Sequence, residues 1–176
     1  MRFRLRNAAV LISLFLLLGV NGCFSSMFTL GSPEEAKVSR IYVGDWALEG
    51  MDATTLSIRS FDEKSYVVAL VKKDDDGSTK FAYCRGFLAD VKDVTFAHLK
   101  PLGEDGKLGD EWELYRIAIT DGGEIVLRVL DEKYFKDKKI NSNDDLKKIV
   151  EAGLDDDAMY GKKPIKGRRV KTGTGT

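Results

Sequence analysis

Few side chains in this sequence could carry out chemistry. His98 is the only histidine, which excludes histidine pairs, an HExxH motif and most zinc sites. A serine-histidine-acid triad would have to use His98, but no Gly-x-Ser-x-Gly turn presents a serine. The acidic run 74–77 fails as an EF-hand, because Arg85 stands at the twelfth position, where a glutamate is needed. We therefore predict a non-enzymatic protein with no catalytic residue, no metal site and no cofactor.

Cys23 follows a leader with the pattern of a secretory signal. Arg2, Arg4 and Arg6 precede an uncharged apolar run over residues 8–20. As a helix this run would measure roughly 20 Å, which is shorter than the ~30 Å hydrocarbon core of a bilayer. The pattern predicts a signal that is removed rather than a permanent membrane span.

The residues around the end of the leader, Val20-Asn21-Gly22-Cys23, resemble the bacterial lipobox. The resemblance implies that residues 1–22 are a lipoprotein signal peptide and that Cys23 becomes the mature N-terminus. It also implies a thioether-linked diacylglycerol on Cys23 and commonly an acyl chain, such as palmitate, on its amine. Two or three acyl chains anchor a protein stably where one alone would bind reversibly.

The lipid anchor predicts a place in the cell. The protein is expected in the bacterial cell envelope, bound to a membrane through Cys23, with its domain facing the periplasm or the exterior. Phe24 stands after the cysteine in place of an aspartate, which favours the outer membrane if the cell is diderm.

Once Cys23 is lipidated, Cys84 is the only thiol left, so no intramolecular disulfide can form. Cys84 lies in a strand-like stretch without an obvious base beside it, which is typical of a small buried hydrophobic residue. Packing of the core must therefore hold the fold together.

Composition excludes several classes of protein. The chain has 176 residues, is 43% hydrophobic and carries 28 basic and 28 acidic side chains, which argues against disorder and against a multipass membrane protein. Three of the basic residues lie in the leader, so the remainder is mildly acidic. Without a basic surface or a recognition motif, nucleic acid is not an expected partner.

The mature chain reads as one β-rich domain over residues 37–171. Short runs of alternating or continuously apolar residues are separated by turn clusters every 8 to 14 residues or so, which predicts an antiparallel meander that closes into a small barrel or packs as a sandwich. The expected strands cover residues 41–48, 54–61, 66–73, 80–88, 94–99, 111–120 and 124–130.

The segments outside these strands have different patterns. Residues 23–36 are rich in serine and glycine and are predicted to form a flexible tether behind the lipidated cysteine. A cap at 142–145 and apolar residues at helical spacing predict one short C-terminal helix at about residues 143–152. The basic segment 162–171 is read as a charged edge strand or a solvated tail, with contact to lipid headgroups as a further option, and 172–176 as a disordered tail.

Gly44-Asp45-Trp46, followed by about seven strands and then a helix, resembles the lipocalin-like arrangement, in which an opening Gly-x-Trp closes one end of a barrel. The resemblance implies an arginine that packs on the tryptophan. We assign this role to Arg128, on the strand before the helix, so that Trp46 and Arg128 form the expected barrel-closing pair.

A barrel of this kind would have an aromatic interior. The side chains expected to line it are Trp46, Tyr66, Phe81, Tyr83, Phe87, Phe96 and Tyr115. They would suit an apolar or planar ligand, but small eight-stranded barrels are commonly filled by their own side chains. Two functions therefore remain open: a non-catalytic envelope protein that contacts or supports another protein, and a lipocalin-like protein that binds a small apolar molecule.

Overall fold

The computed structural model describes residues 22–103, 105–161 and 163–170. It contains nine strands: β1 (Ser25–Ser26), β2 (Gly44–Leu48), β3 (Thr54–Ser60), β4 (Tyr66–Lys73), β5 (Thr79–Val91), β6 (Val94–Leu102), β7 (Trp112–Ile119), β8 (Glu124–Val129) and β9 (Ile165–Arg169). Two helices, α2 (Glu132–Phe135) and α3 (Asn143–Gly153), and the 3-10 turn η1 (Asp157–Met159) lie between β8 and β9. The expected signal peptide, residues 1–22, lies outside the described residues except for Gly22, as does the expected tail 172–176.

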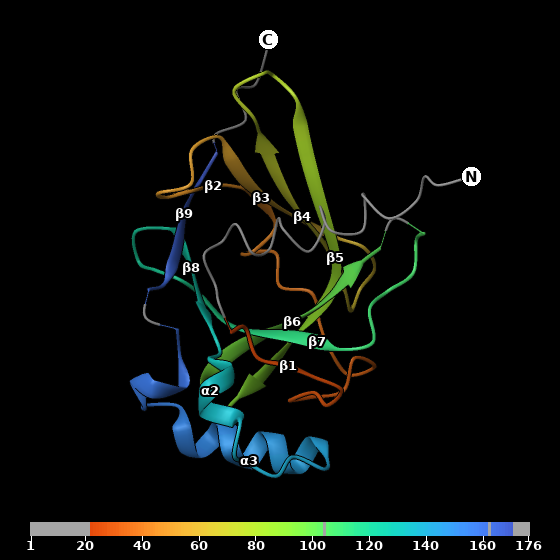
Figure 1. The fold of residues 1–176 in the computed structure, drawn as a ribbon, viewed down its shortest axis with the longest axis vertical. Helices are drawn as coiled ribbons and strands as arrows, with labels where there is room; N and C mark the ends of the chain where they lie inside the picture. Colours follow the sequence, from red (N-terminus) through yellow and green to blue (C-terminus); the bar gives the residue numbers. More distant parts are fainter. Residues whose placement is uncertain (1–21, 104, 162, 171–176) are drawn as a thin grey trace, which may run out of the picture.

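Strands β2 to β9 form a closed antiparallel barrel of eight strands (Figure 1). Each strand pairs with the next one in the chain, and β9 returns to pair with β2, with Trp46 opposite Arg169. The prediction of a mainly β, antiparallel fold is confirmed, and of the two forms that were expected, barrel and sandwich, the barrel is the correct one. Closure leaves no long unpaired edge among these eight strands.

The basic segment supplies the closing strand. Strand β9 lies between β8 and β2, so it is not the edge strand that the sequence suggested. Its burial alternates: Ile165 and Gly167 face inward while Lys166 and Arg168 face outward. Lys166 and Arg168 therefore lie on the solvent side of the barrel wall. Because only every second residue faces the core, a strand with few aliphatic residues can complete it.

The barrel has one apolar core inside it and a second against its outer wall. Strands β6 and β7 show the division, because Ala97 and Tyr115 belong to the inner core and Phe96 and Leu114 to the outer one. Helix α3, predicted at 143–152 and confirmed at Asn143–Gly153, covers the outer core with Leu146 and Val150. Figure 1 shows both helices below the barrel, at the end opposite the β4–β5 hairpin.

The first helical turn of α3 is fixed by its cap. The Ser142 hydroxyl accepts a hydrogen bond from the amide of Asp145, at 3.1 Å. This bond satisfies one of the free amides at the helix N-terminus.

No helix among the described residues has the length and apolarity needed to cross a membrane.

Residues 22–31, which we call the N-terminal strap, pack against the barrel instead of forming a free tether. Ser25 and Ser26 pair with Glu113 and Trp112 of β7, and Leu30 is buried in the outer core. The prediction of a flexible tether over 23–36 is therefore wrong for this part of the segment. Phe24, Phe28 and Leu30 stand among the serines and glycines that suggested flexibility. Phe24 and Leu30 are buried and Phe28 is partly buried, and this apolar contact offsets the cost of ordering the chain.

Candidate functional site

The end of the barrel around Trp46 is closed by an arginine from the last strand. The Trp46 ring is fully buried, and its Nε1 donates a hydrogen bond to the Tyr42 carbonyl at 3.0 Å. The guanidinium of Arg169 lies 4.3 Å from the centre of this ring. Its two terminal nitrogens donate to the carbonyls of Val43 and Ile41, at 2.6 and 2.7 Å. One side chain thus joins the chain before β2 to β9.

Gly44 leaves the space that this contact needs. A Cβ at position 44 would lie 2.5 Å from Nη1 of Arg169, and the backbone there has a φ of +153°, which side chains disfavour. The Gly-x-Trp pattern therefore has a physical reason in this protein: the glycine admits the arginine that the tryptophan stacks on.

The predicted partner of Trp46 was the wrong arginine. Arg128 lies over the ring of Tyr160, at 4.2 Å from its centre, and donates to Asp157 at 2.9 Å. On β8 the neighbours Leu127 and Val129 pack with the inner core, so Arg128 points outward, toward the η1 turn. The arginine that closes the barrel is Arg169, because β9 and not β8 is the neighbour of β2.

The interior holds a small apolar cavity. Its volume is ≈ 60 Å³. It is lined by Tyr42, Leu48, Leu56, Ile58, Tyr66, Val68, Leu70, Cys84, Gly86, Phe87, Leu88, Ala97, Leu99, Tyr115, Ile117, Leu127 and Ile165. Ligand pockets usually measure about 300–1,000 Å³, so in this conformation the barrel is filled mainly by its own side chains.

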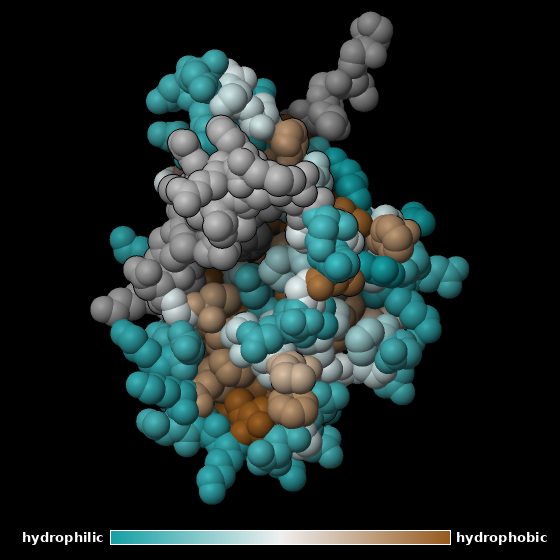
Figure 2. Space-filling view, turned by 45° about the vertical axis from the view of Figure 1, so that its right-hand side comes forward, coloured by the Kyte–Doolittle hydropathy of each residue, from teal (hydrophilic) through white to brown (hydrophobic). Residues whose placement is uncertain are grey.

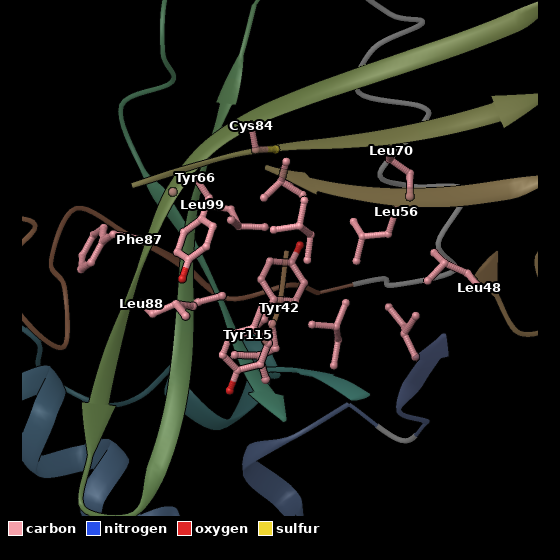
Figure 3. Close-up of a pocket in the computed structure, with 17 residues that line it drawn as sticks. Tyr42, Leu48, Leu56, Tyr66, Leu70, Cys84, Phe87, Leu88, Leu99 and Tyr115 are labelled. Atoms are coloured by element: carbon pink, nitrogen blue, oxygen red, sulfur yellow. The ribbon is translucent and has the colours of Figure 1, made fainter. Parts of the chain in front are cut away.

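The structure divides the seven residues predicted to line the interior. Tyr66, Phe87 and Tyr115 do line the cavity, and Figure 3 shows Tyr66 and Tyr115 directed into it beside Tyr42, while Phe87 lies apart from the other rings. Trp46 is part of the inner core but not of the cavity wall. Tyr42 also lines the cavity and was missed: it lay within the predicted strand 41–48 but in the structure precedes β2.

Three of the seven predictions were wrong. Phe81 and Tyr83 lie outside the barrel, because Ala82 and Cys84, the alternate residues of β5, face inward. Phe96 faces the outer core for the same reason, since its neighbour Ala97 faces the interior. The two-residue period of a strand predicts that neighbouring residues face opposite sides of the barrel wall. It does not say which of the two neighbours faces the interior.

Burial disfavours the charged forms of the polar groups in and beside the cavity. Burial raises the pKa of the Tyr115 hydroxyl and of the Glu113 carboxyl, and these two groups share a hydrogen bond of 2.7 Å. Burial likewise raises the pKa of the Cys84 thiol, whose residue is 2% exposed. A thiol that stays protonated is a poor nucleophile, so the interior offers an apolar surface rather than a reactive one.

Cys23 lies at the edge of this interior. Its Sγ is 3.7 Å from the Tyr115 hydroxyl. Burial, with Glu113 adding to the effect, raises the pKa of the Cys23 thiol to about 12. If Cys23 carried a diacylglycerol, its sulfur would have to turn outward, away from the Tyr115 hydroxyl. The hydroxyl would keep its hydrogen bond to the Glu113 carboxyl.

His98 fastens the N-terminal strap to the barrel. It is fully buried, stacked on Phe87 at 4.5 Å, and its Nε2 accepts a hydrogen bond from the Leu30 amide at 3.0 Å. No hydrogen-bond acceptor among the described residues meets Nδ1. Burial lowers the pKa of His98 to about 3, so the imidazole is neutral at physiological pH.

An apolar patch lies on the outer surface of β5 and β6. Phe81 and Tyr83 stack with ring centres 6.0 Å apart, and Leu102 and Leu108 continue the surface, Leu102 being paired with both Tyr83 and Leu108. Their exposed fractions are 46%, 42%, 38% and 41% in the same order. We call these four residues the aromatic patch.

We predict that replacing Arg169 with lysine destabilises the protein by about 1–3 kcal/mol, because lysine keeps the charge but loses the paired donors and the planar stacking on Trp46. Urea unfolding followed by tryptophan fluorescence measures the change. Arg168→Lys, next to it on the solvent side, is the matched control and should cost less than about 0.5 kcal/mol. Equal stability of the two variants would contradict the assignment of Arg169.

We predict that acid weakens the fold through His98. The folded pKa lies below the unfolded value of about 6.5, so the unfolded state binds the proton more readily and stability falls as pH drops below about 6.5, by up to about 1.4 kcal/mol per unit. Glu113, whose pKa is raised, acts in the opposite direction. His98→Gln keeps an acceptor near Nε2 without a titrating group, so its unfolding free energy should vary less between about pH 7 and 5. An unchanged slope would rule out the role of His98.

The described residues contain no cluster of three or more histidine, cysteine, aspartate or glutamate side chains that could hold a metal ion. Comparison of the chain with models of known protein families, with curated proteins and with solved structures gives no match.

Proposed function

We propose that this protein is a lipid-anchored protein of the bacterial cell envelope whose barrel is a non-catalytic module for contact with another protein. The observation that carries the second part is the aromatic patch on the outside of a nearly filled barrel. Aromatic residues are enriched in the cores of protein interfaces, and exposed apolar surface of this kind marks interaction sites. The patch is the place where we expect an envelope partner to bind.

The first part of the proposal is supported by the leader and by Val20-Asn21-Gly22-Cys23, which resembles a lipobox. Lipidation of Cys23 would bind the protein to a membrane, with its domain on the periplasmic or external side. The outer membrane is favoured if the cell is diderm. In lipoproteins that stay in the inner membrane an aspartate follows the cysteine, and here Phe24 stands in that position.

A second candidate function is the binding of a small apolar molecule inside the barrel. It is favoured by the cavity of ≈ 60 Å³, whose lining is almost entirely apolar, and by the lipocalin-like closure at Trp46. A ligand of ordinary size would have to displace flexible side chains of the lining, such as Leu88 or Leu99. The interior supplies hydrophobic contact but few fixed polar groups to orient a ligand.

We predict that Cys23→Ser releases the protein from membranes. The variant cannot form the thioether, so the protein should move to the soluble fraction after a high-salt wash, whereas the wild-type protein stays with the membranes. Mass spectrometry of the N-terminal peptide should find the lipid on wild-type Cys23. A wild-type N-terminal peptide that carries no lipid would disprove the anchor.

We predict that the aromatic patch, and not the barrel interior, holds the partner. In cells, the wild-type lipoprotein treated with a short crosslinker should give a discrete adduct that the double variant Phe81→Ser, Tyr83→Ser loses. Phe61→Ser, which removes another exposed aromatic ring, is the control and should keep the adduct.

Native mass spectrometry of residues 22–176 with Cys23→Ser separates the two functions. The apo mass is expected. A small apolar molecule retained at one per chain, together with an adduct that the double variant keeps, would favour the second candidate over the first.

A further inference from the structure

The N-terminal strap leaves no free chain between the proposed anchor and the folded domain. The amide of Phe24, the residue after Cys23, donates to the Leu130 carbonyl at 2.9 Å, and its own carbonyl accepts from Leu114 at 3.4 Å. The Phe24 ring is 7% exposed and stacks on Phe135 of α2 at 4.0 Å between centres. The backbone of Cys23 pairs with Asp131, directly before α2, whereas its Sγ is 3.7 Å from the Tyr115 hydroxyl and would have to turn outward to carry a lipid.

The position before Cys23 is also held by α2. The Glu132 amide donates to the Gly22 carbonyl at 2.8 Å. When the signal is removed and the Cys23 amine is acylated, the acyl carbonyl is bonded to the same nitrogen as the Gly22 carbonyl was. The Glu132 amide can then donate to the acyl carbonyl in its place, which keeps the start of this acyl chain beside α2.

The segment that follows Glu132 is rich in lysine. Lys133, Lys136, Lys138 and Lys139 are all exposed, and Asp137 is the only acid among residues 133–139. None of these four lysines forms an ion pair with a described residue. We call them the α2 lysines. In Figure 2 hydrophilic side chains rim the lower end of the molecule, where α2 and α3 lie.

The basic segment of β9 is less suited to such a contact. Arg169 is occupied by Trp46, and Arg168 pairs with Glu49 and Glu124 at 3.4 and 3.0 Å. The α2 lysines, by contrast, form no ion pair with a described residue, although the Lys138 ammonium lies 4.2 Å from the centre of the Tyr134 ring. All four follow Glu132, whose amide bonds to the Gly22 carbonyl, within seven residues of sequence. Attraction between basic side chains and an anionic bilayer falls off within a Debye length of about 8–10 Å. Only lysines close to the anchor are therefore attracted to the lipid headgroups.

We propose that the α2 lysines lie on the anionic headgroups of the membrane that holds the Cys23 anchor, so that the barrel stands on the bilayer in one fixed orientation. The proposal rests on the lipidation of Cys23 proposed above. In this orientation the α2 end faces the membrane. The β4–β5 hairpin, at the opposite end of the molecule, points away from it (Figure 1). Phe81 and Tyr83 lie on β5 close to this hairpin, so the aromatic patch is presented to partners away from the bilayer.

The test uses the lipidated full protein in vesicles of phosphatidylethanolamine and phosphatidylglycerol. Asp137→Cys and Asp75→Cys each place one reactive thiol on an exposed aspartate, the first beside the α2 lysines and the second in the β4–β5 turn. Cys84 is buried and Cys23 carries lipid, so only the new thiol takes a fluorophore. Lipids with a nitroxide on the headgroup should quench the fluorophore at position 137 several-fold more than the one at 75. Equal quenching would overturn the proposal.

A second pair of variants tests the lysines themselves. Changing Lys133, Lys136, Lys138 and Lys139 together to glutamine should lower the quenching at position 137 roughly twofold. The matched control changes Lys73, Lys107, Lys163 and Lys166, which are exposed elsewhere, and should leave the quenching unchanged. Equal quenching in both quadruple variants would overturn the headgroup contact.

The mass of the N-terminal peptide separates failure of this inference from failure of the anchor. A lipidated Cys23 with equal quenching at positions 137 and 75 overturns the fixed orientation alone and leaves the proposed anchor intact. A peptide without lipid overturns the anchor, and the orientation with it.

Discussion

The contact between Arg169 and Trp46 is the interaction on which the barrel depends. It joins the last strand to the chain before the first, through stacking on the ring and two hydrogen bonds to carbonyls of Ile41 and Val43. Without β9 in place, β2 and β8 would be the two free edges of an open sheet, and the inner core would face water along that gap. The chain has no disulfide to replace this closure.

The outer core extends the barrel to the proposed membrane anchor. The N-terminal strap, α2 and α3 cover one part of the wall, and Phe24, Phe135 and the buried His98 tie them to it. Because the strap includes Cys23, no free linker would separate a lipid on this residue from the barrel. The fold thus connects a proposed anchor at one end with an apolar patch near the other.

Local patterns in the sequence predicted the local structure well. Turn clusters located most strands, the Ser142 cap located α3, and Gly44-x-Trp46 located the closed end of the barrel. Features set by distant contacts were not predictable in this way. The choice of Arg169 over Arg128 depends on β9 pairing with β2, more than a hundred residues earlier in the chain. The outward direction of Phe81 and Tyr83 depends on register, and the strap was hidden because its three apolar anchors are spaced among serines and glycines.

A double-mutant cycle on Trp46→Phe and Arg169→Lys tests the closure of the barrel most directly, because it isolates the energy that the two side chains share. The unfolding free energies of the wild-type protein, both single variants and the double variant give the coupling. We predict a favourable coupling of about 0.5–2 kcal/mol between the two residues. Additive effects, with a coupling of less than about 0.3 kcal/mol, would contradict the claim that Arg169 and Trp46 hold the first and last strands together.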